Sequence, residues 1–536
     1  MINEIYSGLH FFLLFLLVIT ILLCPYDCFP SGKGGRLLVG LSSQIKTLDS
    51  QKATSLEEKI LINQIQDGIF EYDANNQIIP VLATSLPKQE EQNHYIVKLK
   101  QDIYFHDGTE LDGKSVHYTL NRLRKLFDQT PIIDLFNGIE TIKSLDKYTL
   151  LFVLRENSLP LEYLLSRTEM YPLSESSVEQ YGDLYGKVIS IGTGPFRLIE
   201  WAKASEIILE RNPKYWNNPY PFLYKIDFIH INEDRLKALR WGKVHLLPNV
   251  LLSETKKLQS RNIKIVHKPG RCLGQIYLNI SQQPFINIKF REAVALSINK
   301  KELIDTVFDG YATPATSCLP PWKNNVNSIL YTTDLYNTDY NLEKARKLIE
   351  EIKYEKRFSP RRQFFFEKDD TLSFDLMYTN EEIFHQQALI IQNQLSQVGI
   401  EVNLRPLLKK DLFDYVYGKN NHDRSLFQSA LEDWEDWEGG GDERQFISKL
   451  YYSNSNENKV GLNNPVIDQL IEEASRTQDL DKRENLFRSA AKKIDAIIPC
   501  IYLYFSDNII AFRTYVKGVE WNNLGQMWFE KIYIQR

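Results

Sequence analysis

The segment Gly108-Thr-Glu-Leu-Asp-Gly113-Lys114-Ser115 has the residue types and spacing of a nucleotide-binding loop. It matches the pattern G-x-x-x-x-G-K-[ST], in which backbone N–H groups surround phosphate oxygens and a lysine balances their charge. Two carboxylates, Glu110 and Asp112, stand inside this loop and would face the triphosphate. The apolar stretch Leu150–Leu154 downstream does not end in the aspartate that such proteins use for magnesium. We therefore predict a turn leading into a helix, and no nucleotide site.

Other patterns that carry catalysis are missing from the sequence. There is no H-E-x-x-H, no paired C-x-x-C and no G-x-S-x-G. The nine histidines are scattered, and His94, His106 and His117 share no metal-ligand spacing. We expect no catalytic residue, no metal site and no cofactor.

Size and composition describe a folded protein of at least two lobes. The chain has 536 residues, and a single core stops growing at about 250–300 residues. Hydrophobic residues make up 43% and charged residues 25%, as in ordinary folded proteins. The net charge of −5 and the lack of a clustered basic face argue against nucleic acid as a partner.

The N-terminus carries an apolar run, Phe11–Cys24, of the length of a signal-peptide core. No lysine or arginine precedes it, and the only ionisable side chains before it are Glu4, Tyr6 and His10. The run is interpreted as a signal peptide or as an uncleaved anchor, and both place the rest of the chain in the periplasm or cell envelope. Cys24 and Cys28, at the end of the run, are the candidates for lipid attachment, although neither follows a small residue.

Three further cysteines, Cys272, Cys318 and Cys500, lie in the body of the chain. An odd number leaves at least one thiol outside any internal disulfide. We expect them to be buried as small apolar groups, with their disulfide state left open.

The elements that must position any site follow from apolar periodicity. Alternating or continuous apolar runs predict strands, and apolar residues at helical spacing predict helices. Asp112 or Ser115 is the expected N-cap of the helix over 116–127, Gly399 the expected end of another, and Gly192–Gly194 a close approach of two backbones. The predicted strands are Leu37–Leu41, Tyr95–Phe105, Ile400–Arg405 and Ile501–Phe505. The other predicted helices are Phe290–Asp305, Leu342–Ile352, Ile383–Val398, Val466–Ala474 and Lys482–Ile494. Mixed elements over this length predict α/β lobes, each with its own sheet.

Several blocks resemble one family. The stretch Ile103–Val116 resembles the "F-H-D-G-T-P-L-T-A-x-D-V" segment of the family 5 extracellular solute-binding proteins, the oligopeptide- and dipeptide-binding group. Ile191–Leu198 is similar to its G-T-G-P-Y motif, and Tyr277–Asn279 with Phe290–Lys300 to its "Y-L-x-F-N … R-x-A-L-x-x-A-I-D" block. The blocks occur in the family's order and extend from about Leu37 to the end of the chain.

The resemblance implies an α/β, two-lobed periplasmic-binding-protein fold (type II, cluster C) with a ligand cleft between the lobes. Residues 1–29 would be the signal peptide or anchor with its linker. The lobes and the subdomain are assigned as Pro30–Asp73, Ile189–Pro269 and Ser506–Arg536 for lobe I, Ala74–Val188 for its accessory subdomain, and Gly270–Phe505 for lobe II. The function implied is that of a non-enzymatic, monomeric binding component of an ABC transporter. It would capture short peptides and deliver them to permease subunits in the inner membrane.

The peptide binders of this family use a "W-x-x-D-Y-x-D-P" segment to hold the peptide's amino terminus. Its counterpart is Leu431–Asp442, in which Trp434 and Asp436 are one residue closer and three glycines replace the proline turn. The resemblance assigns Trp434, with Trp437 beside it, as an aromatic wall. It assigns Asp436 as the partner of the ammonium group, with Asp433 as the alternative. A solvated acidic loop is the competing interpretation.

Tyr277 and Asn279 are weaker ligand-contact candidates, because a buried strand explains them equally well. The same fold also binds nickel chelates, haem or oligosaccharides in relatives, so fold alone leaves the solute open. A hydrolase using Asp433 and Asp436 is the last alternative, and it would need carboxylates about 5–9 Å apart on opposing walls.

Overall fold

The computed structural model describes residues 34–127, 136–156, 158–202, 206–231, 234–250, 252–255, 260–321, 340–357, 372–417, 427–434 and 443–535. Within these residues one mixed sheet of eleven strands runs through the molecule. Its order is β15-β14-β16-β12-β17-β11-β1-β10-β9-β8, and β13 pairs with β17. In that order the bounds are Ile400–Leu407, Leu372–Thr379, Ser429–Trp434, Ile263–Leu278, Cys500–Arg513, Leu246–Leu247, Arg36–Leu41, Lys225–His230, Glu206–Arg211 and Phe196–Ala202, with β13 at Ala312–Pro314.

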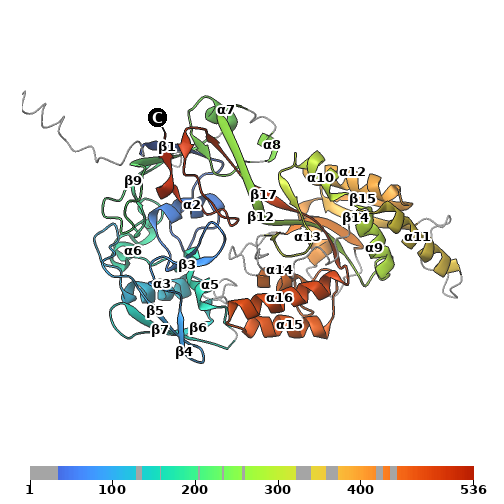
Figure 1. Cartoon of the computed structure of the whole chain (residues 1–536), viewed down its shortest axis with the longest axis horizontal. Helices are drawn as coiled ribbons and strands as arrows, with labels where there is room; N and C mark the ends of the chain where they lie inside the picture. The colour runs from blue at the N-terminus through green and yellow to red at the C-terminus, as the bar shows by residue number, and fades with distance from the viewer. Residues whose placement is uncertain are drawn as a thin grey trace, which may run out of the picture.

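Two long antiparallel strands, β12 and β17, connect the two halves of the molecule (Figure 1). Their first register joins Ile263 to Arg513 and Pro269 to Asp507, beside β11 and β1. Their second register begins at Leu273 opposite Phe505, beside β16. Between the two registers, residues 270–272 of β12 face the single residue 506 of β17. This bulge interrupts the ladder where the chain passes from one half of the molecule to the other.

The half that holds the first and last described residues, 34 and 535, is built on β1, β10, β9 and β8, with α2 (Leu56–Ile65) packed against them. Ser55 and Glu58 form a capping box at the start of α2. The neighbouring Glu57 accepts hydrogen bonds from the backbone N–H groups of Ser42 (2.7 Å) and Ser43 (2.9 Å). The first turn of α2 therefore fixes the loop that leaves β1.

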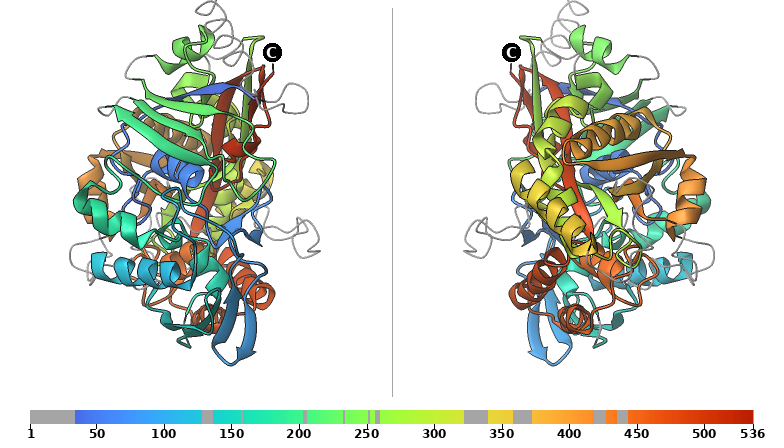
Figure 2. Two further views of the ribbon diagram at one scale, coloured as in Figure 1. Left: turned by 90° about the vertical axis from the view of Figure 1, so that its left-hand side faces the viewer. Right: turned by 90° about the vertical axis from the view of Figure 1, so that its right-hand side faces the viewer.

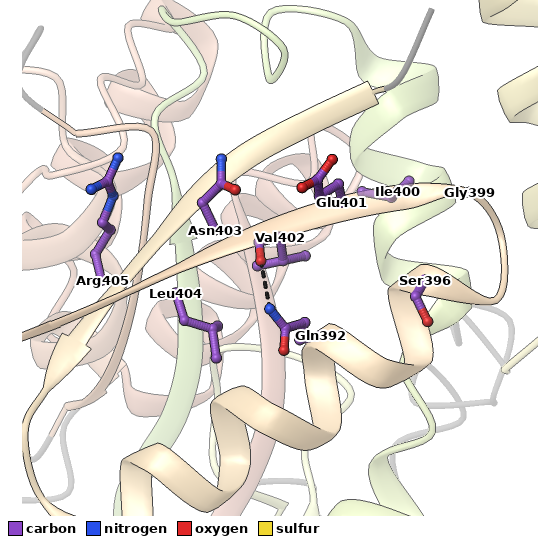
Figure 3. Close-up of a pocket in the computed structure, with 9 residues that line it drawn as sticks. All are labelled: Gln392, Ser396, Gly399, Ile400, Glu401, Val402, Asn403, Leu404 and Arg405. Atoms are coloured by element: carbon purple, nitrogen blue, oxygen red, sulfur yellow. Dashed lines mark hydrogen bonds between the residues drawn. The ribbon is translucent and has the colours of Figure 1, made fainter. Parts of the chain in front are cut away.

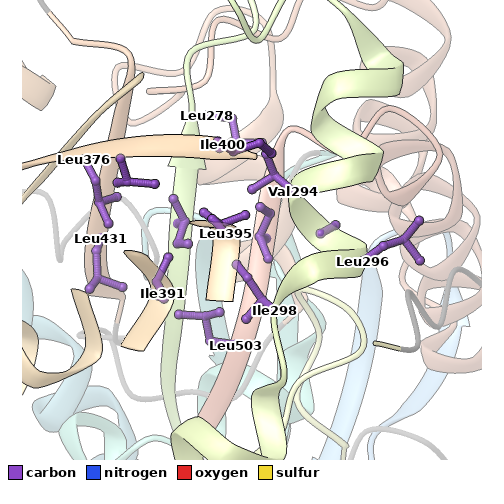
Figure 4. Close-up of a cluster of buried hydrophobic side chains, with 14 of the residues drawn as sticks. Leu278, Val294, Leu296, Ile298, Leu376, Ile391, Leu395, Ile400, Leu431 and Leu503 are labelled. Carbon is purple, nitrogen blue, oxygen red and sulfur yellow. The ribbon is translucent and has the colours of Figure 1, made fainter. Parts of the chain in front are cut away.

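The other half is built on β14, β15 and β16, covered by α9 (Ile288–Ser297), α10 (Lys300–Val307), α11 (Leu342–Arg357) and α12 (Glu382–Ser396). Leu376 and Leu431 from the sheet meet Ile391 and Leu395 from α12 in a core with no exposed surface (Figure 4). On the opposite face lie α14 (Glu443–Tyr451), α15 (Pro465–Arg476) and α16 (Leu480–Asp495), which enclose a separate core. Helix α13 (Lys409–Tyr417) packs near β14 and β15.

A separate four-stranded antiparallel sheet projects from the first half, at the bottom of both views in Figure 2. Its order is β4-β5-β7-β6, with bounds Lys88–Glu91, His94–Lys98, Thr149–Leu154 and Ile139–Ser144. Helix α3 (Gly113–Leu126) packs beside it, and the Asp112 carboxylate accepts hydrogen bonds from the N–H groups of Lys114 (2.8 Å) and Ser115 (3.4 Å). The loop that resembles a nucleotide-binding motif is thus a turn and a helix N-terminus already occupied by a carboxylate.

The remaining elements are short. The hairpin β2–β3 and the pair β18–β19 stand apart from the larger sheets. Their bounds are Phe70–Tyr72, Ile78–Pro80, Val516–Lys517 and Tyr533–Ile534. The short helices are α5 (Leu161–Leu165), α6 (Glu175–Tyr181), α7 (Arg235–Arg240), α8 (Leu252–Thr255) and the 3-10 turns Thr168–Met170, Gly182–Leu184 and Phe529–Lys531.

Most of the predicted elements are confirmed, and three predictions are wrong. The helix predicted over Phe290–Asp305 is two helices, because the Asn299 side chain accepts the Glu302 N–H and caps α10. The strand predicted to reach Phe105 ends at Lys98, and Ile103 and Phe105 instead enter a small core of their own. The two halves share one sheet rather than each having its own, since β12 and β17 run through both.

The fold is the expected two-lobed α/β fold, with the halves on either side of the β12–β17 bulge as its lobes. The bulge lies at the 269/270 and 505/506 boundaries, but the full assignment of lobe I, accessory subdomain and lobe II stays a prediction. No helix among the described residues is long and apolar enough to cross a membrane. The run Phe11–Cys24, with Cys24 and Cys28, lies outside these residues.

The glycines at 192 and 194 lie against the end of α2, which confirms the predicted close approach. Gly194 N–H donates to the Ile65 carbonyl over 2.9 Å, and a Cβ at 194 would lie 2.5 Å from the Ile65 carbonyl carbon.

Since backbone cannot yield as a side chain does, we expect Gly194→Ala to lower the free energy of unfolding by about 3 kcal/mol. Urea titration measures this. As a control, Gly108→Ala meets nothing within 4 Å and should cost about 1 kcal/mol for its left-handed backbone; equal losses would contradict the explanation.

Candidate functional site

Asp433 lies near the end of β16, close to the bulge between the lobes. The register places it opposite Gly274 of β12, and Gly274 in turn opposite Tyr504 of β17. Residues opposite each other in neighbouring strands project from the same face of a sheet. Asp433, position 274 and Tyr504 therefore form one row across β16 and the two strands that connect the lobes, β12 and β17.

Glycine at 274 allows the outer two side chains of this row to meet. A Cβ at this position would lie 2.2 Å from Tyr504 Cζ, so the tyrosine ring lies directly over the glycine. The Tyr504 hydroxyl thereby reaches β16 and donates to Asp433 Oδ1 over 2.8 Å. The same hydroxyl oxygen lies 3.2 Å from Gln387 Oε1 of α12.

The environment of Asp433 opposes its negative charge. Burial raises the pKa of Asp433 to about 6, and the nearby Glu432 and Glu381 add to the rise. Hydrogen bonds from Tyr504 and from Cys272, in the bulge, act in the opposite direction because they stabilise the carboxylate. The result is an acid that exchanges its proton in mildly acidic solution, placed where both lobes meet.

Trp434 projects from the opposite face of β16 and is 5% exposed. Its ring lies 4.8 Å from that of Phe446 in α14, in the core beneath α14–α16. This side chain packs into the core beneath α14–α16, and its role as a wall of the ligand site stays a prediction.

Tyr277 and Asn279 are buried. Tyr277 accepts a hydrogen bond from Gln275 Nε2 (2.9 Å), and Lys459 Nζ lies 4.3 Å from its ring centroid. Asn279 Nδ2 donates to the Phe427 carbonyl over 3.0 Å. These contacts show that both residues support β12 and the turn that follows it. Their role as ligand contacts stays a prediction.

Asp436 and Trp437 lie outside the described residues, directly after the end of β16. The sequence analysis did not anticipate Tyr504, Gly274 or Cys272 beside Asp433. A glycine inside an alternating apolar strand is the one signal that could have indicated the close approach at 274.

A pocket of about 690 Å³ lies elsewhere in this lobe, along the edge strand β15 (Figure 3). Gln392 of α12 donates to the Val402 carbonyl across it over 2.8 Å, while Glu401, Asn403 and Arg405 project from the strand. No residue of the row at Asp433 lines it. Among the described side chains, no three histidine, cysteine, aspartate or glutamate residues come together as metal ligands.

Comparison with known proteins identifies the family. The model for "Bacterial extracellular solute-binding proteins, family 5 Middle" matches residues 77–458, well over half of the chain. The chain belongs to this family. Family 5 proteins are the substrate-binding components of ABC transporters, which bind solutes and deliver them to a permease; the relatives found are binding proteins rather than enzymes.

The similar proteins differ in their solutes. The glutathione-binding protein GsiB of Pectobacterium atrosepticum is 26% identical over 477 residues, covering 87% of this chain and 88% of its own. The binding protein DppA of Helicobacter pylori, solved with the peptide STSA, is 22% identical with a TM-score of 0.66, over 94% of this chain and 99% of its own. The nickel ABC transporter protein of Bacillus halodurans is 20% identical with a TM-score of 0.77, over 93% and 100%. This family 5 protein therefore has the common fold, and the fold leaves its solute open.

The hydrogen bond from Tyr504 gives a direct test of the site's electrostatics. In Tyr504→Phe the carboxylate loses a donor, so we expect the pKa of Asp433 to rise above about 6. Carbon-13 NMR titration of labelled aspartate, assigned by comparison with Asp433→Asn, measures the shift. Because the folded pKa exceeds the ordinary 3.8, ionisation of Asp433 should reduce stability as pH rises from about 4 to 6.

The matched control is Tyr452→Phe, since the Tyr452 hydroxyl donates to Glu472 at the surface over 2.9 Å. This variant should leave the pKa of Asp433 unchanged. A pKa of Asp433 that stays constant or falls in Tyr504→Phe would contradict the assignment.

Proposed function

We propose that this family 5 protein captures short peptides between its lobes and delivers them to the permease of an ABC importer. Asp436 would balance the peptide's free ammonium group, and the aromatic rings of Trp434 and Trp437 would flank it. The observation that carries the proposal is the position of β16. This strand ends with Asp433 and Trp434, which lie opposite Gly274 and Leu273 of β12, next to the bulge at the junction of the lobes.

Asp433 supports Asp436 as the ammonium partner. One oxygen of Asp433 already accepts the Tyr504 hydroxyl, and Cys272 donates as well, so the protein itself satisfies much of this carboxylate. Asp436 follows three residues later, in the position that the family resemblance assigns to the ammonium partner. Asp433 would then anchor the segment, and it remains the alternative partner.

Two of the similar proteins support a peptide as the solute. Glutathione, named for the relative with 26% identity, is itself a small peptide-like molecule, and a second similar protein was solved with a bound tetrapeptide. A charged ammonium at one end and main-chain hydrogen bonds along the rest would hold many sequences, because neither contact depends on side chains.

The proposed location follows from the same role. The apolar run Phe11–Cys24 would direct export and leave the protein in the periplasm or cell envelope. Retention of this segment, or lipid attachment at Cys24 or Cys28, would tether the protein beside its permease.

A double-mutant cycle tests the proposal. A buried ammonium and carboxylate must be matched, since an unpaired buried charge is costly. We expect Asp436→Asn to weaken binding of a short peptide by about 2–5 kcal/mol, or one to several decades in Kd. Acetylating the peptide's amino terminus should weaken binding to the unmodified protein comparably, and the two changes together should cost clearly less than their sum. Calorimetry on the four combinations measures this.

Asp433→Asn is the matched control, because it removes a neighbouring carboxylate. If acetylation couples with Asp433→Asn and not with Asp436→Asn, our assignment of the ammonium partner is refuted. Coupling at neither would refute recognition of the amino terminus and favour a metal chelate or oligosaccharide as the solute.

A further inference from the structure

A second cavity, of about 320 Å³, lies within the lobe built on β1, β10, β9 and β8. It is bounded by the end of α2, the β2–β3 hairpin, the segment at Tyr215 and Trp216, and the C-terminal segment at Trp528 and Glu530. None of its lining residues belongs to β12, β16 or β17. The cavity is therefore separate from the junction of the lobes, and its size is at the lower end for small-ligand sites.

One carboxylate of the cavity, that of Asp67, has three hydrogen-bond donors from the protein. Asp67 accepts hydrogen bonds from Trp216 Nε1 (2.9 Å), Thr193 Oγ1 (3.1 Å) and the Tyr215 hydroxyl (3.2 Å). The Lys100 ammonium lies 4.1 Å from the centroid of the Trp216 ring and adds a favourable charge. Burial raises the pKa of Asp67, and these three hydrogen bonds with the Lys100 charge offset part of that rise.

Two other carboxylates and an amide oxygen in the cavity have fewer hydrogen-bond donors than Asp67. Glu530 is only 9% exposed, and the described part of the chain offers its carboxylate no donor except its own backbone N–H. Glu71 accepts one hydrogen bond, from Gly68 N–H (2.7 Å). Asn63 Oδ1 is buried and, among the described residues, accepts none. Lys531, one of the two lysines that line the cavity, pairs with Glu520 over 2.7 Å.

These acceptors have few hydrogen-bond donors, and the pKa values of the two carboxylates reflect this. Burial raises the pKa of Glu530 to about 7 and the pKa of Glu71 well above its ordinary value. The charge of Asp67 raises both further. A cavity of this kind stabilises a ligand group that is both positively charged and a hydrogen-bond donor. Such a ligand group balances the negative charge of the carboxylates and donates hydrogen bonds to the acceptors at the same time.

We propose that this cavity is a second ligand site, which binds a small organic cation with a primary ammonium head and an alkyl stem. The head has three N–H donors, which match the acceptors on Glu71, Glu530 and Asn63. The aromatic side chains of Tyr72, Tyr215 and Trp528 line the same cavity and would cover the stem. A bare metal ion fits less well, since the residues described include no convergent set of three metal ligands.

The test uses 1,5-diaminopentane as the probe and calorimetry on the whole protein. We expect one equivalent to bind at pH 8, and pentane-1,5-diol, which has the same stem without the charge, not to bind. Binding should be about tenfold weaker at pH 6, because a Glu530 with a pKa of about 7 is then mostly protonated. The other ionisable groups around it are Asp67, Glu71, Tyr72, Asp73, Tyr215, Glu520, Lys100 and Lys531.

Glu530→Gln and Glu71→Gln should each weaken binding of the probe at least tenfold at pH 8. The matched control is Glu110→Gln, which removes a surface carboxylate paired with Lys147 and should leave binding unchanged. The pH comparison needs no variant, so it decides the question even if a substituted chain does not fold. Absence of binding at pH 8, equal binding of the diol, affinity that does not fall at pH 6, or full affinity in a folded Glu530→Gln would each overturn the proposal.

Discussion

The pairing of β12 with β17 is the contact on which the rest of the structure depends. Each strand is long enough to belong to both lobes, so one backbone ladder carries the sheet of one lobe into the other. The ladder is interrupted where residues 270–272 face residue 506, and its register shifts again between Gly274 and Gln275. A Cβ at 270 would lie 2.6 Å from the Ser506 carbonyl oxygen. The lobes are thus joined by two strands at a bulge, and a few residues there can absorb a rotation of one lobe against the other.

This junction also explains why Asp433 is held as it is. Its carboxylate contacts Cys272, inside the bulge, and Tyr504, two residues before the bulge position on β17. The acid is therefore coupled to both connecting strands. Gly274 makes the arrangement feasible, since any side chain there would displace the Tyr504 ring. The strand β16 is in this way fixed to the junction of the two lobes.

Local pattern predicted much of the fold. Helices such as α12 and α15, and the glycine at 399 with its left-handed backbone, follow from periodicity and capping. The two-lobed fold came from ordered family motifs, because no local pattern reveals that β12 and β17 pair over nearly 250 residues of sequence. The break between α9 and α10 was missed because the Asn299 cap competes with helix continuation. Tyr504 and Gly274 were missed because only the register of three strands brings them to Asp433.

The central claim is that this family 5 protein carries peptides between its lobes. The most direct test is native mass spectrometry of the protein purified without unfolding, with the ligand identified after release. The account predicts a population of complexes heavier than the free chain by the masses of peptides of a few residues, which sequencing of the released material would identify. Release of a nickel chelate, haem or an oligosaccharide, with no peptide among the bound molecules, would contradict it.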